Sequence, residues 1–246
     1  MTFKPCMTAL ALAVAATSLG VHAQENHDVK KISEWNYDSL YEGGGIRADN
    51  LMDTEVFGPE GEEIGSVENV IIGEGDRIVA VIAQVGGFWD MGDTHVAVPW
   101  EEVELTDDGV QIPVSEDNAD DYGVFENEHV TKEELQYTTQ VDDDVETGYR
   151  TWKLTDFLDD YASLEGGVGY GYVENVIFSK DGQMEAVVIQ ADSAFGGDDY
   201  AYPFYGYDYN WDPGYATYEL PYDENEVNEL ETFDYDQFDD TWEWDS

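Results

Sequence analysis

The stretch that decides the fold is Gly65-Ser66-Val67-Glu68-Asn69-Val70-Ile71, because it recurs 106 positions later as Gly171-Tyr172-Val173-Glu174-Asn175-Val176-Ile177. The same offset places Ala-Val-Ile-Ala-Gln at 80–84 onto Ala-Val-Val-Ile-Gln at 186–190. Two further matches have offsets of 104 and 108: Ala97-Val98-Pro99-Trp100 with Ala201-Tyr202-Pro203-Phe204, and Ile112-Pro113 with Leu220-Pro221. Self-similarity at this length indicates two copies of one structural unit.

The repeat divides the chain of 246 residues. We expect a signal peptide at 1–23, an N-terminal linker at 24–45, a first unit at 46–130 and an acidic linker at 131–150. A second unit follows at 151–238, with an aromatic insertion at 205–216, and residues 239–246 form an acidic tail. The lengths suit two small domains rather than one large one.

Each unit is predicted to consist of strands. The runs at 67–72 and 78–85 are short, rich in β-branched residues and separated by Gly73-Glu74-Gly75-Asp76. Their counterparts surround Lys180-Asp181-Gly182, and Asp-Gly is a strong hairpin signal. Further strands are expected at 95–100 and 110–114, and short helical turns at Thr131 with Glu134, after Ser115 and after Asp223. The fold class is therefore all-β.

The first unit resembles the PRC-barrel family. The resemblance is carried by the chained elements Ile64-Gly65, Val67-Glu68-Asn69-Val70-Ile71, Ala80-Val81-Ile82, Val85-Gly86-Gly87-Phe88, Gly92-Asp93 and Val96-Ala97-Val98-Pro99-Trp100. It implies two tandem small β-barrels with short helical turns, used for docking or assembly and not for catalysis. The second unit has Ser193-Ala194-Phe195-Gly196-Gly197 in place of the Gly-Gly-Phe element. The rim of the second barrel is therefore expected to contact a different partner from the rim of the first.

The composition is extremely acidic, with 57 Asp and Glu against 9 Lys and Arg and a formal charge of −48. Nucleic acid and anionic membranes are excluded as partners, because both require clustered basic residues. Aromatic residues make up 14 % of the chain, which is too many for an acidic disordered segment. About fifty like charges repel one another unless salt screens them, so we expect a halophilic surface.

The first 23 residues have the pattern of a secretory signal. Lys4 precedes an apolar run at 7–21. The segment ends in Val21-His22-Ala23, which has small residues at the third-last and last positions before an expected cleavage site preceding Gln24. Cys6, the only cysteine, lies inside this segment, so the exported chain is expected to have no disulfide or thiolate. The expected location is the periplasm, as a soluble protein.

No catalytic arrangement is predicted. Outside the signal the histidines are His27, His95 and His129, without metalloprotease spacing, and His95 is expected on the surface of the first unit. A carboxylate-based hydrolase would need two acids at a defined separation, and the sequence singles out no such pair. The sequence therefore predicts no catalytic residues and no cofactor. A bound Ca²⁺ ion is the alternative to the absence of a cofactor.

The Ca²⁺ alternative rests on Asp208, Asn210, Asp212 and Glu219, which occupy positions 1, 3, 5 and 12 of a twelve-residue window. This is the ligand spacing of an EF-hand loop. Pro213 stands where that loop needs glycine, and no flanking helices are predicted. A solvated aromatic loop is the competing interpretation.

The aromatic insertion has the most unusual local composition. Its predicted partner-binding residues are Tyr205, Tyr207, Tyr209, Trp211 and Tyr215. Tyr and Trp are enriched in binding surfaces. The alternative is that these rings cover the end of the second barrel, which has few aliphatic residues of its own.

Taken together, these features predict an exported, non-catalytic interaction or assembly module with an unknown protein partner. A periplasmic protein that binds divalent cations is the alternative, and a carboxylate hydrolase is a third.

Overall fold

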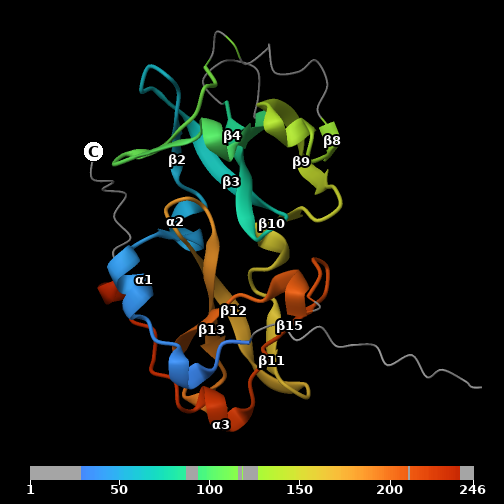
Figure 1. The fold of residues 1–246 in the computed structure, drawn as a ribbon. Helices are drawn as coiled ribbons and strands as arrows, with labels where there is room; N and C mark the ends of the chain where they lie inside the picture. Colours follow the sequence, from blue (N-terminus) through green and yellow to red (C-terminus); the bar gives the residue numbers. More distant parts are fainter. Residues whose placement is uncertain (1–28, 87–93, 116–117, 119–126, 210, 239–246) are drawn as a thin grey trace, which may run out of the picture.

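The computed structural model describes residues 29–86, 94–115, 118, 127–209 and 211–238. It is mostly β-sheet with a few short helices, as the sequence predicts. Figure 1 shows β2, β3, β4, β8 and β9 in the upper half of the molecule and β11, β12, β13 and β15 in the lower half. Among the described helices, none is long and apolar enough to cross a membrane.

The first sheet has the strand order β6-β7-β2-β3-β4-β5-β9-β8, with β10 paired to β3 outside this path. Its strands are β2 (Glu55–Phe57), β3 (Glu63–Gly73), β4 (Arg77–Val85), β5 (Thr94–Pro99), β6 (Glu104–Thr106), β7 (Gly109–Gln111), β8 (Asn127–Val130), β9 (Thr139–Thr147) and β10 (Trp152–Lys153).

The second sheet has the order β14-β13-β12-β11-β15, with β1 paired to β12 outside this path. Its strands are β1 (Ile46–Arg47), β11 (Tyr161–Leu164), β12 (Val168–Phe178), β13 (Met184–Ala191), β14 (Asp199–Pro203) and β15 (Thr217–Glu219).

The repeat seen in the sequence is present in the pairing register. Val67 lies opposite Ala83 in the first sheet, and Val173 opposite Ile189 in the second, each 106 positions on. A register shift follows at the same place in both hairpins, before Asn69 and before Asn175. The parallel pairs β2 with β7 and β11 with β15 also correspond.

The two repeats exchange their first strands. Ile46 of β1 pairs with Phe178 of the second sheet, and Trp152 of β10 pairs with Ile72 of the first. Each exchanged strand leads into one helical turn, α2 (Ala48–Leu51) or η5 (Leu154–Asp156). Because positions 46 and 152 are equivalent, this is a reciprocal exchange about a pseudo-two-fold axis within one chain.

An asparagine of the repeated motif anchors each exchange. Asn69 donates from its side chain to the Thr155 hydroxyl (2.8 Å), and its Oδ1 faces the Thr155 backbone N–H at 3.5 Å. At the equivalent place, the Asp49 backbone N–H donates to Asn175 Oδ1 (3.3 Å). Asn175 is among the few buried polar side chains in the described part of the chain.

Two segments that the sequence assigns to linkers cover the outer faces of the sheets. In the first sheet, Leu135 and Val145 pack over Ile71, Ala80 and related side chains. In the second, Tyr37 and Leu40 pack over the equivalent Ile177 and Ala186, together with Phe233 and Phe238. The 24–45 and 131–150 segments therefore include ordered parts of the two halves: η1 (Ile32–Glu34) and α1 (Asp38–Gly43) in one, η4 (Glu134–Gln136) and β9 in the other.

The sequence does not predict strand β9. It contains Asp142, Asp143 and Asp144, which indicate a solvated connector, yet it pairs with β5 through Val141 opposite His95. Its two buried side chains, Val141 and Val145, are enough to hold one face against the sheet. Tertiary pairing here overrides a composition that is unfavourable for strands.

The outer edge of β14 is blocked without a further strand. The Trp35 indole donates to the Ala201 carbonyl (2.8 Å), and the Ala201 backbone N–H donates to the Tyr37 hydroxyl (3.2 Å). The Phe233 N–H donates to the Asp199 carbonyl (2.7 Å). These contacts satisfy an edge that could otherwise pair with another chain.

Two of the predicted helical turns are confirmed. Glu134 accepts from Thr131 at the start of η4, and Asp223 and Glu226 form a capping box at α3 (Glu224–Val227). The turn expected after Ser115 falls largely outside the described residues. The remaining short helical turns are η2 (Trp100–Glu102), η6 (Ser193–Phe195), η7 (Gly206–Tyr209) and η8 (Tyr235–Gln237).

Candidate functional site: a cleft where the two sheets meet

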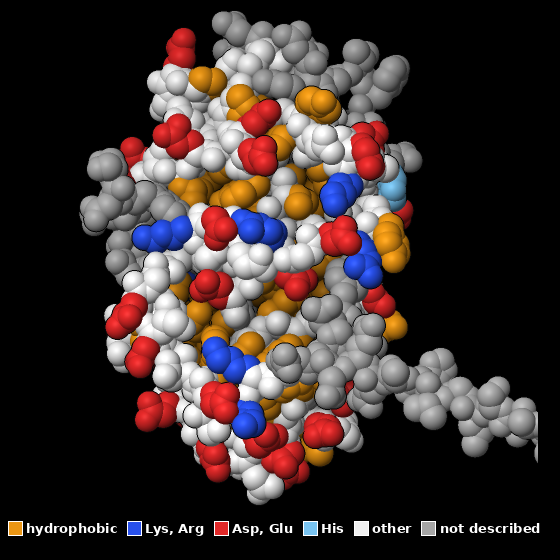
Figure 2. All heavy atoms as spheres, viewed as in Figure 1, with side chains coloured by type: hydrophobic (Ala, Val, Ile, Leu, Met, Phe, Trp, Pro, Cys, Tyr) orange, Lys and Arg blue, Asp and Glu red, His pale blue; other side chains and the backbone are white. Residues whose placement is uncertain are grey.

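A cleft of about 840 Å³ opens where the first sheet meets the β12–β13 turn. Its walls come from the β3–β4 turn, η2 and the segment around η4. The lining residues are Glu74, Arg77, Ile78, Val79, Pro99, Trp100, Glu101, Lys132, Leu135, Gln136, Tyr137 and Asp181. Figure 2 shows hollows floored by apolar side chains across the middle of this face, bordered by blue and red ones.

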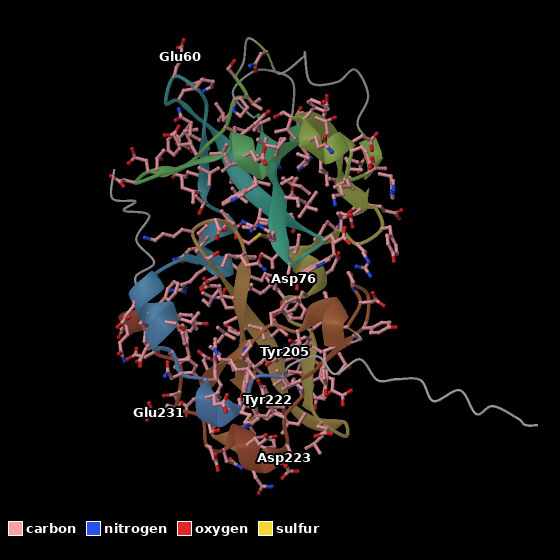
Figure 3. The ribbon with its side chains drawn as sticks, in the orientation of Figure 1. Glu60, Asp76, Tyr205, Tyr222, Asp223 and Glu231 are labelled. Atoms are coloured by element: carbon pink, nitrogen blue, oxygen red, sulfur yellow. The ribbon has the colours of Figure 1, made fainter. Side chains whose placement is uncertain are left out.

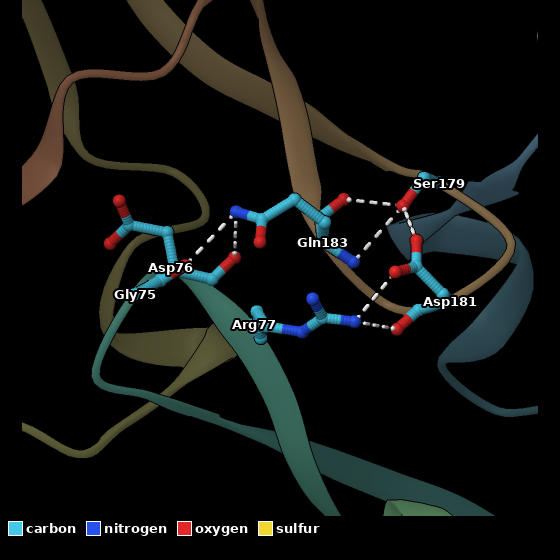
Figure 4. A network of polar contacts seen from close by, with 6 residues as sticks. All are labelled: Gly75, Asp76, Arg77, Ser179, Asp181 and Gln183. Carbon is cyan, nitrogen blue, oxygen red and sulfur yellow. Dashed lines mark hydrogen bonds and ion pairs between the residues drawn. The ribbon is translucent and has the colours of Figure 1, made fainter.

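At the base of the cleft, the two equivalent hairpin turns meet around the pseudo-two-fold axis. The Ile78 N–H donates to the Gly182 carbonyl (2.9 Å), and the equivalent Met184 N–H donates to the Asp76 carbonyl (2.8 Å). Between them, Arg77 and Gln183 form an antiparallel bridge. The Gln183 side-chain amide donates to the carbonyls of Gly75 and Asp76, both at 3.0 Å (Figure 4). The two turns are thus held together by paired backbone groups.

Arg77 adds an ion pair across this junction. Its guanidinium donates to the Asp181 carboxylate (2.7 Å) and to the Asp181 backbone carbonyl (2.8 Å), as drawn in Figure 4. The Ser179 hydroxyl donates to the same carboxylate (2.5 Å). The Ser179 hydrogen bond and the Arg77 contacts hold the pKa of Asp181 below its ordinary value. Asp181 is therefore a fixed anion that orients Arg77 at the rim.

A second group of charges lies on the other side of the cleft. Glu74 accepts ion pairs from Lys132 and from Arg150, each at 3.4 Å. All three side chains are about half exposed. Exposed pairs of this kind contribute little to stability, so their partners can be replaced at low cost. The lining of this cleft therefore holds two basic groups, Arg77 and Lys132, beside the acids Glu74, Glu101 and Asp181.

Trp100 forms the wall nearest the β12–β13 turn. Gly182 has φ of +81°, and a Cβ there would lie 2.9 Å from the Trp100 indole nitrogen. Both the backbone conformation and the ring require glycine at this position. Across the cleft, Tyr137 is 71 % exposed, although Leu135 two residues before it is buried. An aromatic ring is thus presented to solvent beside an apolar floor.

The cleft has the chemistry of a docking site. It has apolar walls and convergent charged groups, and the described residues that line it include no histidine, cysteine or serine. Such a surface can seat an extended or aromatic segment while Arg77 and Lys132 contact its acidic groups.

The aromatic residues predicted for partner binding are not among those that line the cleft. Trp211 is buried and packs against Phe157 (4.8 Å) and Trp152 (4.9 Å), so it belongs to the core of the described structure. Tyr205 bonds the Tyr222 hydroxyl (2.9 Å) and accepts from the Lys30 backbone N–H (3.0 Å); both rings are labelled in Figure 3.

Of the remaining predicted aromatic residues, Tyr209 is half-buried beside Tyr205, with ring centroids 6.1 Å apart. Tyr215 is 54 % exposed. The Tyr207 side chain lies outside the described residues. Of the predicted aromatic residues whose side chains are described, Trp211 is therefore buried and Tyr205 and Tyr209 are half-buried, whereas Tyr215 is exposed.

The predicted cation ligands are only partly described. Asn210 and the side chain of Asp208 lie outside the described residues. Asp212 is exposed, and Glu219 accepts from the Gly166 backbone N–H (3.3 Å). Within the described part of the chain, no three His, Cys, Asp or Glu side chains are grouped so as to hold a metal ion.

His95 is less exposed than the sequence suggests. Its side chain is 12 % exposed, and its Nε2 lies 2.7 Å from the Glu68 carboxylate. This contact joins β5 to β3. Gly87 and Phe88 of the Gly-Gly-Phe element lie outside the described residues.

The sequence did not single out the cleft residues as a site. Trp100 stands out in the sequence only as a member of the repeat, and no motif marks Arg77, Lys132 or Tyr137. One signal is present: the chain has nine basic residues, and Arg77 directly follows the first hairpin turn while Lys180 lies in the equivalent second turn. Basic residues at corresponding turns of an acidic repeat indicate a place where the repeats meet.

Comparison with known families identifies the first repeat. Residues 43–119 match the family model of the PRC-barrel domain, so a PRC-barrel domain is present in this part of the chain. The match ends before the second repeat begins. No curated protein matches the chain.

Proposed function

We propose that this chain is an exported, non-catalytic interaction module built from two PRC-type barrels, and that it docks a protein partner in the cleft around Trp100. The observation that carries the proposal is the cleft itself. It combines an apolar floor, the exposed ring of Tyr137 and the cations Arg77 and Lys132 in a chain of formal charge −48.

Support for a second PRC unit comes from the repeat. The PRC-barrel match covers the first repeat, and the strands of the second follow the same order and register. Both sheets also carry the parallel strand that returns beside β2 or β11. Two units joined in this way present a junction that neither has alone, and the cleft lies at that junction.

Export and adaptation to salt are supported by the sequence and by the position of the charges. The leader at 1–23 has the order of a secretory signal. None of the buried side chains in the described part of the chain is charged. The acids described therefore lie at or near the surface, where salt screens their repulsion.

Partner capture with matched variants tests the proposal. Tagged protein would be incubated with periplasmic extract from the source organism, and the captured proteins identified by mass spectrometry. Tyr137→Ser and Lys132→Glu should reduce capture of a specific partner at least tenfold, since both side chains are exposed at the cleft.

Tyr215→Ser is the matched control, because Tyr215 is an exposed tyrosine of the aromatic insertion. It should leave capture unchanged. Loss of the partner in Tyr215→Ser, with full capture by both cleft variants, would place docking on the insertion and contradict the proposal.

A further inference from the structure

We infer that the chain's own C-terminal segment, residues 239–246, docks in the cleft around Trp100 and competes with the partner there. The inference rests on the proposed function for the identity of the site and adds its regulation. The segment reads Asp-Asp-Thr-Trp-Glu-Trp-Asp-Ser and follows directly after the described part of the chain.

The docking groove is longer than the cleft alone. A second hollow of about 280 Å³ also borders Trp100 and is lined by Val103, Glu104, Leu105 and Lys180. Trp100 lines both hollows. We call the two together the Trp100 groove. Lys180 lines one hollow, and Lys132 and Arg77 line the other, with Arg77 at the junction of the two repeats.

The groove gathers a large part of the basic charge. Arg77, Lys132 and Lys180 line it, and Arg150 shares Glu74 with Lys132. These are four of only nine basic residues in the whole sequence. The ion pairs of Lys132 and Arg150 with Glu74 are exposed and contribute little to stability. An incoming acidic segment can therefore replace some of those contacts.

The end of the described chain lies close to this groove. Phe238 is buried, and its ring is 3.4 Å from the position that a Cβ would take on Gly45. The Phe178 carbonyl lies against the same position on Gly45. Phe178 is the last residue of β12, only two and three residues before the groove residues Lys180 and Asp181.

The length of the segment matches this spacing. Eight extended residues span at most about 28 Å, whereas the three residues from Phe178 to Asp181 span about 10 Å. The segment can therefore cross the β12–β13 turn and lie along the groove past Trp100.

The chemistry of the segment also fits the groove. It carries four acids, Asp239, Asp240, Glu243 and Asp245, and no basic residue. In an extended conformation Trp242 and Trp244 would point to one side and Glu243 and Asp245 to the other. That arrangement would place two indoles on the apolar floor and carboxylates toward the rim, where Arg77, Lys132 and Lys180 lie among acidic side chains.

Attachment in the same chain strengthens a weak contact. A short tether gives an effective concentration in the millimolar range, so even a contact of modest affinity is largely formed. A partner must then displace the segment. Partner binding should consequently increase when the segment is removed.

A spin label at the end of the segment tests this directly. Ser246→Cys in a Cys6→Ser background provides one labelling site, because Cys6 is the only native cysteine. In ¹⁵N-tryptophan-labelled full-length protein, the indole resonance of Trp100 should broaden at least as strongly as any other indole outside the segment. The broadening should disappear with D239N/D240N/E243Q/D245N and with K132E/K180E. Trp100 intensity equal to that of the reduced, diamagnetic sample would overturn the inference.

Two controls separate the alternatives. Mixing labelled ¹⁴N protein with unlabelled ¹⁵N protein reports contacts between copies, and Trp100 broadening in that mixture alone would show a second copy in the groove and overturn docking in the same chain. Partner capture by a chain ending at Phe238 should rise about threefold or more. If cleft variants abolish capture but the spin label does not reach Trp100, the inference fails and the proposed function stands.

Discussion

Single residues of the repeat are fixed by close backbone contacts. Gly65 and Gly171 occupy equivalent positions, and a Cβ on either would collide with the carbonyl of Gln84 or Gln190 on the neighbouring strand. The repeated motif therefore begins with glycine for a steric reason that its apolar residues do not share.

We expect Gly65→Ala and Gly171→Ala each to lower the free energy of unfolding by about 2 kcal/mol or more, because the neighbouring backbone must move. Gly43→Ala is the matched control. A Cβ there meets no atom within 4 Å, so stability should change little. Denaturant unfolding of the three variants measures this, and equal stability of all three would contradict the steric explanation.

Asp160 is the clearest pH-sensitive residue. Burial, followed by the charge of Asp156, raises its pKa to about 6, against the opposing hydrogen bond from the Trp211 indole. In the first repeat the equivalent residue is the uncharged Thr54. Since the folded state favours the protonated acid, Asp160 destabilises the fold above pH 6, and that effect is lost as pH falls toward 4.

Asp160→Asn should therefore stabilise the protein above pH 6, by about 1 kcal/mol after allowing for partial exposure. The advantage over the wild type should shrink to nearly nothing at pH 4. Urea unfolding at both pH values measures the difference. An advantage of the same size at pH 4 and pH 7 would show that the charge of Asp160 is not its cause.

At the scale of elements, the main finding is the exchange of β1 and β10. The two motif asparagines anchor it, but Asn175 is buried whereas Asn69 is half-buried. Removing a buried hydrogen-bonding group leaves its partners unsatisfied. We expect Asn175→Ala to lower the free energy of unfolding by about 2 kcal/mol and Asn69→Ala by about 1 kcal/mol.

Hydrogen exchange locates the effect of these two variants. Asn175→Ala should increase exchange at Asp49 and in β1, and Asn69→Ala should do so at Thr155 and in β10. Increased exchange confined to the mutated repeat would contradict the exchange of strands between repeats.

The sequence predicted the strands that carry their own pattern. β3, β4, β12 and β13 were visible from the repeat, their β-branched residues and their turns. The exchange was not visible, because β1 and β10 are two residues long and their partner strands lie far away in the sequence, Phe178 for Ile46 and Ile72 for Trp152. The sequence also did not predict that segments 29–41 and 130–145 pack over the outer faces of the sheets. A few apolar residues in a polar segment do not show which sheet they contact.

The candidate site was predictable only in part. The hairpin at Asp181-Gly182 was expected, but its contact with Asp76 and Arg77 depends on the relation between the repeats. The aromatic insertion attracted attention through composition. Composition cannot separate a ring that fills a core, such as Trp211, from one that faces solvent, such as Tyr215.

For the whole molecule, the dominant property is its charge. The core is apolar in the described residues, and the acids surround it. At 1 M salt the Debye length falls to ~3 Å, which removes most of the repulsion between separated carboxylates. The melting temperature should therefore rise by roughly 2 to 8 °C between 0.05 and 1 M NaCl, as expected for a gain of about 1 to 2 kcal/mol in a chain of this length.

Thermal scans in NaCl and in KCl measure this effect. Equal increases in the two salts indicate screening. A melting temperature that is constant from low to molar salt would contradict the view that the acidic surface is an adaptation to salt.

The central claim is that the junction of the two repeats is a docking site. Hydrogen exchange of the full chain with and without its captured partner tests it most directly. We predict that the partner protects backbone amides at 76–78, 99–102 and 131–137, which surround the cleft. Protection confined to 205–218, or unchanged exchange around the cleft in the saturated complex, would contradict this account.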